Sequence, residues 1–267
     1  MIDLDAVNKG FSGKAEVYDA YCASHPVISW ARDLIRREVA SRIAADASIL
    51  ELNAGTGSDA EYFVSQGFRV HATDVADGML AVIRQRIASL NDDGRLTAQQ
   101  LSFTELESVS GAPFDLIFSN FGGLNCIPDL QAVTRALPSL LKPHGIVVWV
   151  VMPKICPWEL AQALRGHVRV AGRRLSPHGT LANVEGAGVM TWYHSPASVR
   201  KAFGDSFRLL RRQSISLFSP PSYMDGFPKR YPQLTKFLLG LDERFGAWFP
   251  FNRWGDFLMY TFRYEPV

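Results

Sequence analysis

The sequence predicts an α/β fold in which helices cover both faces of a doubly wound, mostly parallel sheet. Two observations predict it. Short apolar runs alternate with segments of helical periodicity from 48 to 152, and this alternation is typical of strands joined by crossover helices. The last run, IVVWVVM at 146–152, is apolar without interruption, which is the pattern of a parallel strand covered on both faces.

The elements of this core follow in order along the chain. The first helix, 58–67, is expected to begin with a capping box made by Ser58 and Glu61. The second, 77–90, has an apolar stripe at helical spacing. A third, 128–141, should be interrupted at Pro138, because proline removes a backbone hydrogen bond. The other expected strands are SILEL at 48–52, FRVHATD at 68–74, RLTAQQL at 95–101 and FDLIFSN at 114–120.

The core, 48–152, is expected to lie in a single domain that spans 1–267. Residues 1–47 show helical spacing and predict an N-terminal helical cap. Residues 153–206 have weaker periodicity and predict an insertion on the substrate side. Four arginines in this insertion fit either a solvated surface strand or a grip on an anionic group: Arg165, Arg169, Arg173 and Arg174.

Residues 207–267 are expected to add two strands, 207–219 and 256–266. Between them, the segment 219–255 is rich in aromatic residues: eleven of the 40 residues from 218 to 257 are Phe, Trp or Tyr. This enrichment predicts a lid over an apolar pocket. A helical flap with its own small core, or a dimer contact, remains an alternative, and both a monomer and a homodimer are compatible with the sequence.

Composition excludes several classes of function. The net charge of +2 lacks the basic excess of a nucleic-acid-binding surface. No apolar run approaches the roughly 20 residues of a membrane span, so a cytoplasmic protein with no membrane partner is expected. Cys22, Cys126 and Cys156 are far apart and show no CxxC spacing, which argues against a disulfide framework and a metal site.

The stretch GTGSDA at 55–60 fits the G-x-G-x-x-G/A pattern of a ligand-binding turn between a strand and a helix. Glycines allow positive φ and bring a ligand close to the backbone. Asp74 ends the next strand, 17 residues after Gly57, where a carboxylate can accept hydrogen bonds from ribose hydroxyls. The pattern therefore predicts an adenosine-containing cofactor.

Glu51, at the end of the first strand, indicates which cofactor this is. A carboxylate beside the turn repels the pyrophosphate of a nicotinamide dinucleotide. It favours a ligand with ammonium or sulfonium groups and no phosphate, which describes S-adenosylmethionine. The alternative is that Glu51 is only a solvated strand end.

The sequence from 49 to 80, ILELNAGTGSDAEYFVSQGFRVHATDVADGML, resembles the opening of a class I S-adenosylmethionine-dependent methyltransferase, and FDLIFSN and LKPHGIVVWV follow in the expected order. The resemblance covers residues 48–152 and implies a Rossmann-like, seven-stranded sheet with an antiparallel last strand and a lid inserted after the fifth strand. It implies methyl transfer with S-adenosylmethionine as cofactor. It also implies cofactor contacts from Tyr18, Tyr21, Glu51, Asn53, Ala54, Gly55, Thr56, Gly57, Asp74, Val75, Met79, Ser102, Phe103, Ser119 and Asn120.

Within this resemblance, Asp74 should bind the ribose, and Val75 and Met79 should flank the adenine. Asn53 replaces the usual first glycine of the turn, and asparagine tolerates the left-handed φ required there better than most residues. Ser102 stands where an acidic residue often binds the adenine amino group. Tyr18 and Tyr21, in the sequence AEVYDAY, are expected to close over the cofactor from the N-terminal helices.

Methyl transfer from a sulfonium is an in-line displacement, so the protein chiefly orients two reactants and excludes water. A base is needed only if the acceptor must lose a proton early. TWYHSP offers His194 and Tyr193 as candidates. The loop NFGGLNCIP at 120–128 should face the acceptor. It lacks the Pro-Pro-aromatic motif of nucleobase methyltransferases, which favours a small-molecule oxygen or nitrogen acceptor over a nucleic acid.

Three alternatives remain open. The first is an enzyme of the same fold that uses S-adenosylmethionine without methylating, such as a cyclase or decarboxylase. The second is a nicotinamide-dependent reductase, which Glu51 disfavours. The third is a non-catalytic cofactor-binding protein.

Overall fold

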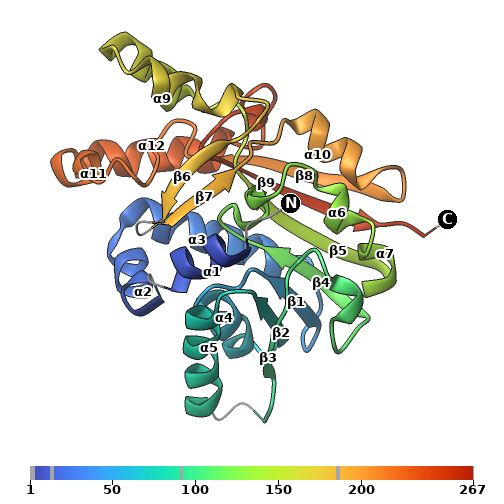
Figure 1. Ribbon diagram of the computed structural model, residues 1–267. Coiled ribbons are helices and arrows are strands. Elements are labelled where there is room, and N and C mark those ends of the chain that lie inside the picture. Colours follow the sequence, from blue (N-terminus) through green and yellow to red (C-terminus); the bar gives the residue numbers. More distant parts are fainter. Residues whose placement is uncertain (1–3, 13–14, 91–92, 185–186, 267) are drawn as a thin grey trace.

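A computed structural model describes residues 4–12, 15–90, 93–184 and 187–266. Its centre is a seven-stranded sheet in the order β3-β2-β1-β4-β5-β9-β8, shown in Figure 1. The first five strands run parallel, and β9 runs antiparallel to both β5 and β8. The predicted doubly wound, mostly parallel fold is therefore confirmed. The strands are β1 Ser48–Leu52, β2 Arg69–Asp74, β3 Leu96–Gln100, β4 Phe114–Ser119, β5 Leu141–Val151, β8 Phe207–Ile215 and β9 Phe257–Tyr264.

Helices cover both faces of this sheet because its central strands are apolar on both sides. On one face, α3 (Pro26–Ala40), α4 (Ser58–Ser65) and α5 (Asp77–Ser89) pack in a core that contains Ile35, Phe63, Ile83 and Val148. On the other face, α6 (Gln131–Thr134), α7 (Leu137–Leu140) and α10 (Pro196–Phe203) pack around the fully buried Trp149. The helix expected at 128–141 is interrupted as predicted, since α7 restarts with Pro138 in its first turn.

Two short helices, α1 (Leu4–Ser12) and α2 (Ala15–Ser24), precede α3. The Asn8 amide donates to Asp77 at 2.8 Å and the Gly78 N–H donates to Ser12 Oγ at 2.9 Å, so α1 is bound to the start of α5. At Gly78, an added Cβ would lie 2.8 Å from the backbone of Ser12. The N-terminal cap therefore approaches the carboxyl end of β2 closely.

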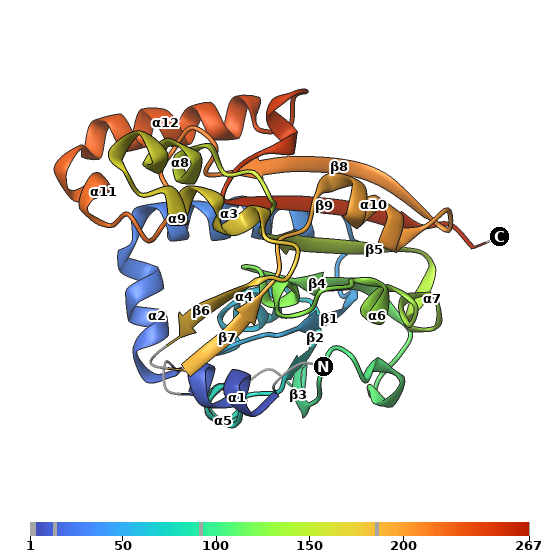
Figure 2. The same ribbon diagram turned by 45° about the horizontal axis from the view of Figure 1, so that its top comes forward.

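The insertion after β5 is mostly helical and ends in a hairpin that the sequence did not predict. It contains α8 (Pro157–Leu160), the 3-10 turns η3 (Ala161–Arg165) and η4 (Arg173–Leu175), α9 (Val168–Gly172), and the strands β6 (Thr180–Val184) and β7 (Ala187–Thr191). The expectation of a solvated surface strand at the arginine run is wrong, because these residues form helical turns. The hairpin extends towards α1, and β7 packs against it (Figures 1 and 2).

The aromatic segment forms α11 (Gly226–Arg230), α12 (Pro232–Phe245) and the turn η5 (Phe251–Arg253). Helix α12 lies beside α3 (Figure 2) and is joined to it by an ion pair between Arg37 and Glu243, with N–O 2.7 Å. Within the described part of the chain, no helix has the length and apolar character needed to cross a bilayer.

Candidate functional site

A cavity of about 260 Å³ lies at the carboxyl ends of the central parallel strands. Open α/β sheets bind ligands at this edge. Many of the residues predicted to contact the cofactor line it: Glu51, Asn53, Ala54, Gly55, Thr56, Asp74, Val75, Met79, Ser102, Phe103 and Asn120. Gly57 and Ser119 adjoin it without lining it. The structure thus brings together residues that are up to 69 positions apart in the sequence.

The turn after β1 has the left-handed backbone that its sequence predicted, with φ of 47° at Asn53, 59° at Gly55 and 75° at Gly57. The Asn53 side chain is fixed on both sides, since its Oδ1 accepts from Ser119 Oγ at 2.7 Å and its amide donates to the Asn120 carbonyl. A Cβ added at Gly123 would lie 2.3 Å from this side chain. Gly123 therefore provides the space that an asparagine at position 53 requires.

The first turn of α4 differs from the sequence prediction. Gly57 is the N-cap, in the left-handed conformation, and no side chain caps the helix. The Ser58 hydroxyl instead accepts hydrogen bonds from Arg32 at 2.7 Å and from Arg36. The predicted capping box of Ser58 and Glu61 is therefore wrong, because two guanidinium groups from α3 compete for the hydroxyl that would form it.

Asp74 connects the glycine turn to the start of the next helix. Its two carboxylate oxygens accept from the Gly55 N–H and the Ala76 N–H, both at 2.8 Å. Burial raises the pKa of this carboxyl, and the same backbone hydrogen bonds oppose that rise. Each oxygen keeps a second lone pair that can accept a hydrogen bond from a ligand.

Glu51 is the most unusual polar group of the cavity. It is only 2% exposed, and its Oε2 has no hydrogen-bond partner among the described residues. Burial, followed by the nearby charge of Asp59, raises the pKa of Glu51 well above its ordinary value. Leaving such an acceptor unpaired is costly, so the group suits a cationic donor in the cavity. Its burial contradicts the alternative that Glu51 is a solvated strand end.

Several charged and polar neighbours of Glu51 were missed in the sequence. Asp59 binds Arg36 Nε at 2.7 Å and accepts from the Asn120 amide at 2.9 Å, and Arg32 lines the cavity beside it. Asp59 belongs to the glycine motif itself, which was an available signal. Arg32 and Arg36 are four residues apart and therefore lie on the same face of a helix that packs on the sheet. Their spacing was a weaker signal than the position of Asp59.

The N-terminal helices contact the turn through an aspartate that the sequence prediction did not include. The Thr56 hydroxyl donates to Asp19 of α2 at 2.6 Å, and Asp19 also pairs with Arg86 of α5. Tyr21 is 44% exposed, packs against the ring of His25 and does not line the cavity. In this structure Tyr21 therefore does not close over the cavity. The Tyr18 side chain lies outside the described residues.

One end of the cavity is predominantly apolar. Val75, Met79, Leu101 and Phe103 line it, together with Phe11 of α1. Ser102 is buried there, and its hydroxyl is hydrogen-bonded to Thr104 at 2.8 Å. The apolar side chains at this end suit a purine ring.

A second part of the cavity is lined by the loop after β4, which contains the 3-10 turn η2 (Gly123–Cys126), and by Met152. The hairpin, which packs against α1, lines the cavity with Ala182, Val189 and Thr191. None of the described residues of the aromatic segment 219–255 is among the lining residues, so the segment is not the cover of this cavity. The hairpin and α1 cover it instead. A signal for the hairpin was the glycine-containing centre of TLANVEGAGVMT.

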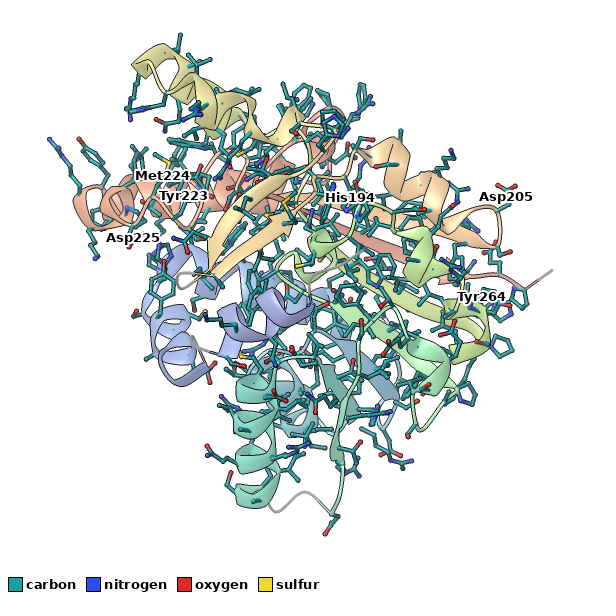
Figure 3. The ribbon with its side chains drawn as sticks, viewed as in Figure 1. His194, Asp205, Tyr223, Met224, Asp225 and Tyr264 are labelled. Carbon is teal, nitrogen blue, oxygen red and sulfur yellow. The ribbon has the colours of Figure 1, made fainter. Side chains whose placement is uncertain are left out.

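The candidate bases lie outside this cavity. His194 follows β7 on the way to α10 (Figure 3), where its backbone N–H donates to the Met152 carbonyl at 3.1 Å. Burial lowers the pKa of His194 to about 4, so the imidazole is neutral at physiological pH. Tyr193 is buried with Arg174 over its ring. Neither residue lines the cavity in this structure.

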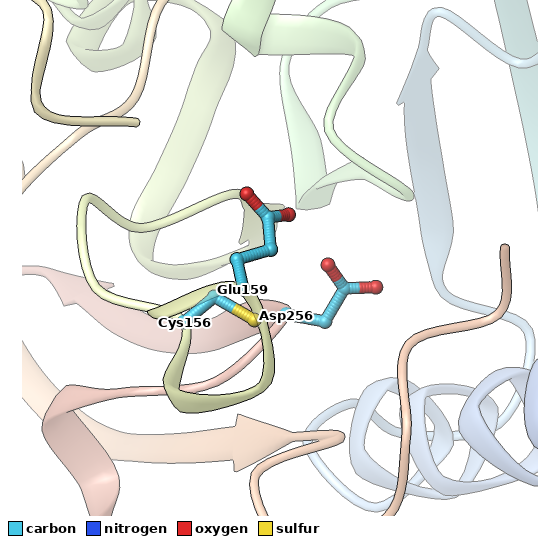
Figure 4. Close-up of side chains that lie close together, drawn as sticks. All are labelled: Cys156, Glu159 and Asp256. Atoms are coloured by element: carbon cyan, nitrogen blue, oxygen red, sulfur yellow. The ribbon is translucent and has the colours of Figure 1, made fainter. Parts of the chain in front are cut away.

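A separate buried cluster consists of Cys156, Glu159 and Asp256 (Figure 4), whose ligand-type atoms lie within 4.8 Å of one another. Guanidinium groups already occupy the positions beside both carboxylates. Arg174 lies 2.6 Å from each carboxylate, and Arg173 lies 2.6 Å from Glu159. This ion-pair network joins α8 and η4 to the start of β9. It also contradicts the expectation that Arg173 and Arg174 remain available for an anionic ligand.

Comparison with known proteins identifies a domain. A family model described as a methyltransferase domain matches residues 49–145. The chain is 31% identical over 136 residues to the demethylmenaquinone methyltransferase of Clavibacter sepedonicus, which covers 50% of this chain and 54% of that protein. It is 26% identical over 214 residues to the malonyl-[acyl-carrier protein] O-methyltransferase of Pseudescherichia vulneris, covering 79% and 78%. The chain thus spans about half the length of the first relative.

Solved structures show the same fold. The CcbJ methyltransferase from Streptomyces caelestis superimposes with a TM-score of 0.62 at 17% identity, covering 95% of this chain and 96% of that one. The [4+2]-cyclase SpnF superimposes with a TM-score of 0.60 at 14% identity, covering 98% and 95%. Residues 49–145 therefore match a methyltransferase domain, and the chain has the same fold as these solved structures.

Proposed function

We propose that this protein transfers the methyl group of S-adenosylmethionine to an oxygen or nitrogen atom of a small-molecule acceptor. The observation that carries the proposal is Glu51, a buried carboxylate with an unpartnered oxygen, beside a glycine turn that opens on a cavity. The site fits a cationic ligand without phosphate, and a dinucleotide would place its phosphates against this carboxylate.

In this proposal the cavity has two sides. On the cofactor side, the turn 53–57 and Glu51 hold the methionine portion, Asp74 binds the ribose hydroxyls, and the apolar residues around Met79 and Phe103 hold the adenine. Arg32, which lines the cavity near Glu51, is positioned for the carboxylate of the methionine portion. Ser119 acts indirectly by fixing Asn53.

When bound, S-adenosylmethionine supplies an electrophilic methyl group on a sulfonium. The contribution of this chain is to orient the acceptor in line with that group and to exclude water, and orientation of this kind contributes roughly 7–11 kcal/mol. The hairpin and α1 exclude water from the cavity. The groups among the described lining residues that could accept a proton from the acceptor are the carboxylates of Glu51, Asp59 and Asp74.

The relatives support only the class of acceptor. Their names give demethylmenaquinone and malonyl-[acyl-carrier protein] as what those proteins methylate. A second candidate function is non-methylating chemistry, such as cyclisation or decarboxylation. The observation that favours it is the structural similarity to SpnF, a [4+2]-cyclase of the same fold.

Calorimetry and product analysis test the proposal together. We expect micromolar or tighter binding of S-adenosylmethionine and S-adenosylhomocysteine, and no binding of NADH. Turnover with a panel of small acceptors should release S-adenosylhomocysteine. Release of methylthioadenosine, or an unchanged cofactor after turnover, would contradict methylation and support the second candidate function. Binding of NADH but of neither adenosyl compound would contradict both.

A further inference from the structure

We infer that the acceptor side of the cavity selects a neutral, largely apolar acceptor, of the class of phenols, enols or aromatic N-heterocycles, and rejects carboxylates. This inference rests on the proposed function, because that function defines which side is which. The acceptor side is the part lined by the loop 121–126, Met152 and the hairpin β6–β7.

Its polar groups are already satisfied by the protein. The Asn125 amide donates to the carbonyls of Met152 and Trp192, and its oxygen accepts from the Met152 N–H at 2.8 Å. The Thr191 hydroxyl donates to the Val189 carbonyl. Asn125 is therefore committed to holding the loop against β5 and β7, and it has no donor left for an anionic ligand.

The charged groups lie mostly on the other side. The charged residues among the described lining residues are Arg32, Glu51, Asp59 and Asp74, and they come from α3 and from the ends of β1 and β2. The one cation among them, Arg32, donates to Ser58 Oγ at 2.7 Å and lies 3.6 Å from Asp59. Arg32 also lies 5.3 Å from the centroid of the Phe121 ring, at the border of the acceptor side, but in the proposed function it binds the methionine carboxylate of the cofactor. A carboxylate on the acceptor side would therefore lose its water without gaining an uncommitted cation, which is strongly unfavourable.

The remaining surface is apolar and confined. Val189, Met152 and Phe121 line this side, and Val189 is only 3% exposed. The cofactor and the acceptor must share the whole cavity of about 260 Å³, which favours a small acceptor.

Matched ligand pairs test the inference. The protein is saturated with S-adenosylhomocysteine, and calorimetry then measures the affinities of several hydroxybenzoate methyl esters and of the corresponding hydroxybenzoates. We expect the neutral ester to bind at least ten-fold more tightly than its carboxylate in each pair. Equal or tighter binding of the carboxylates, or no binding of any neutral member, overturns the inference. Failure of S-adenosylhomocysteine itself to bind is a different result and overturns the proposed function.

A charge placed on the acceptor side should reverse this preference. Val189→Lys should improve the carboxylate-to-ester affinity ratio at least ten-fold, and Ala182→Lys, at a less buried lining position, provides the same test if the first variant does not fold. Leu181→Lys is the matched control, because this side chain is 66% exposed on the same hairpin and does not line the cavity. An unchanged ratio in both folded lining variants, or an equal change in the control, would refute the assignment of this wall to the acceptor.

Discussion

Replacing Glu51 by Gln removes the buried charge beside the glycine turn while keeping the shape of the side chain. A hydrogen bond to a charged group contributes about 1.5–3 kcal/mol, and about 1.4 kcal/mol corresponds to a factor of ten in Kd. S-adenosylhomocysteine retains the ammonium group that Glu51 is proposed to bind. We therefore expect the variant to bind this compound roughly 10- to 150-fold more weakly in calorimetry.

The same variant should be more stable than the wild type in the absence of ligand. Burial, and then Asp59, raises the pKa of Glu51 above its ordinary value of 4.5. A carboxyl with a raised pKa binds more protons in the folded than in the unfolded state. The folded protein therefore loses stability as pH rises from 4.5 through the raised pKa. Gln does not titrate and carries no such penalty. The Tm of Glu51→Gln should therefore exceed that of the wild type at pH values above this range and approach it at pH values below the range.

Binding of S-adenosylhomocysteine should also depend on pH. Because the ionised form of Glu51 accepts from the ammonium group, S-adenosylhomocysteine should bind the wild type more tightly as pH rises through the raised pKa of Glu51, with proton release. Calorimetry in two buffers of different ionisation enthalpy measures that release. Glu51→Gln should remove the Glu51 contribution, and Glu107→Gln, on an exposed turn, should not. Wild-type affinity in Glu51→Gln, or a loss of ligand-free stability that matches the loss of affinity, would show that Glu51 is only structural.

Three further substitutions probe the framework around the site. Asp74→Asn puts an amide donor in place of one of two backbone-accepting oxygens, so thermal melts and calorimetry should both show losses, each about 1–3 kcal/mol; unchanged nucleoside affinity would contradict the ribose contact. Gly123→Ala should lower the free energy of unfolding, measured by urea denaturation, by about 1–3 kcal/mol through overpacking. Adding Asn53→Gly should recover most of this loss. A double variant as unstable as Gly123→Ala would refute the steric explanation. Arg174→Met should cost about 3–5 kcal/mol in the same assay, because two buried carboxylates lose their shared cation, whereas exposed Arg165→Met should change stability by less than about 0.5 kcal/mol.

The fold and the cofactor side were predictable because their determinants are local in sequence. Alternating apolar runs specify the parallel strands, and the turn 53–57 follows its strand directly, so its left-handed residues can be read from their types. Asp74 ends the adjacent strand, and parallel strands bring their carboxyl ends to one edge. These features need no knowledge of how distant segments pack.

The acceptor side could not be predicted, because distant segments assemble it. The hairpin that lines it comes from 180–191, and whether it covers the cavity depends on contacts with α1. His194 was an expected base from its residue type alone, but burial keeps it neutral behind the loop. The aromatic segment is enriched in large side chains, and it packs beside α3 rather than over the cavity. Composition indicates that such a segment is buried, but it does not indicate which element it packs against.

Asn53 and Gly123 show how the two sides of the cavity are connected. An asparagine at φ 47° costs more than the glycine usual at this position, but its side chain gains bonds to Ser119 and to the Asn120 carbonyl. Those bonds hold the end of β4, where the loop to the acceptor side begins. Gly123, in that loop, must lack a side chain for Asn53 to fit. The turn that is proposed to hold the cofactor therefore also fixes the start of the acceptor wall, so a change at either position should alter both sides together.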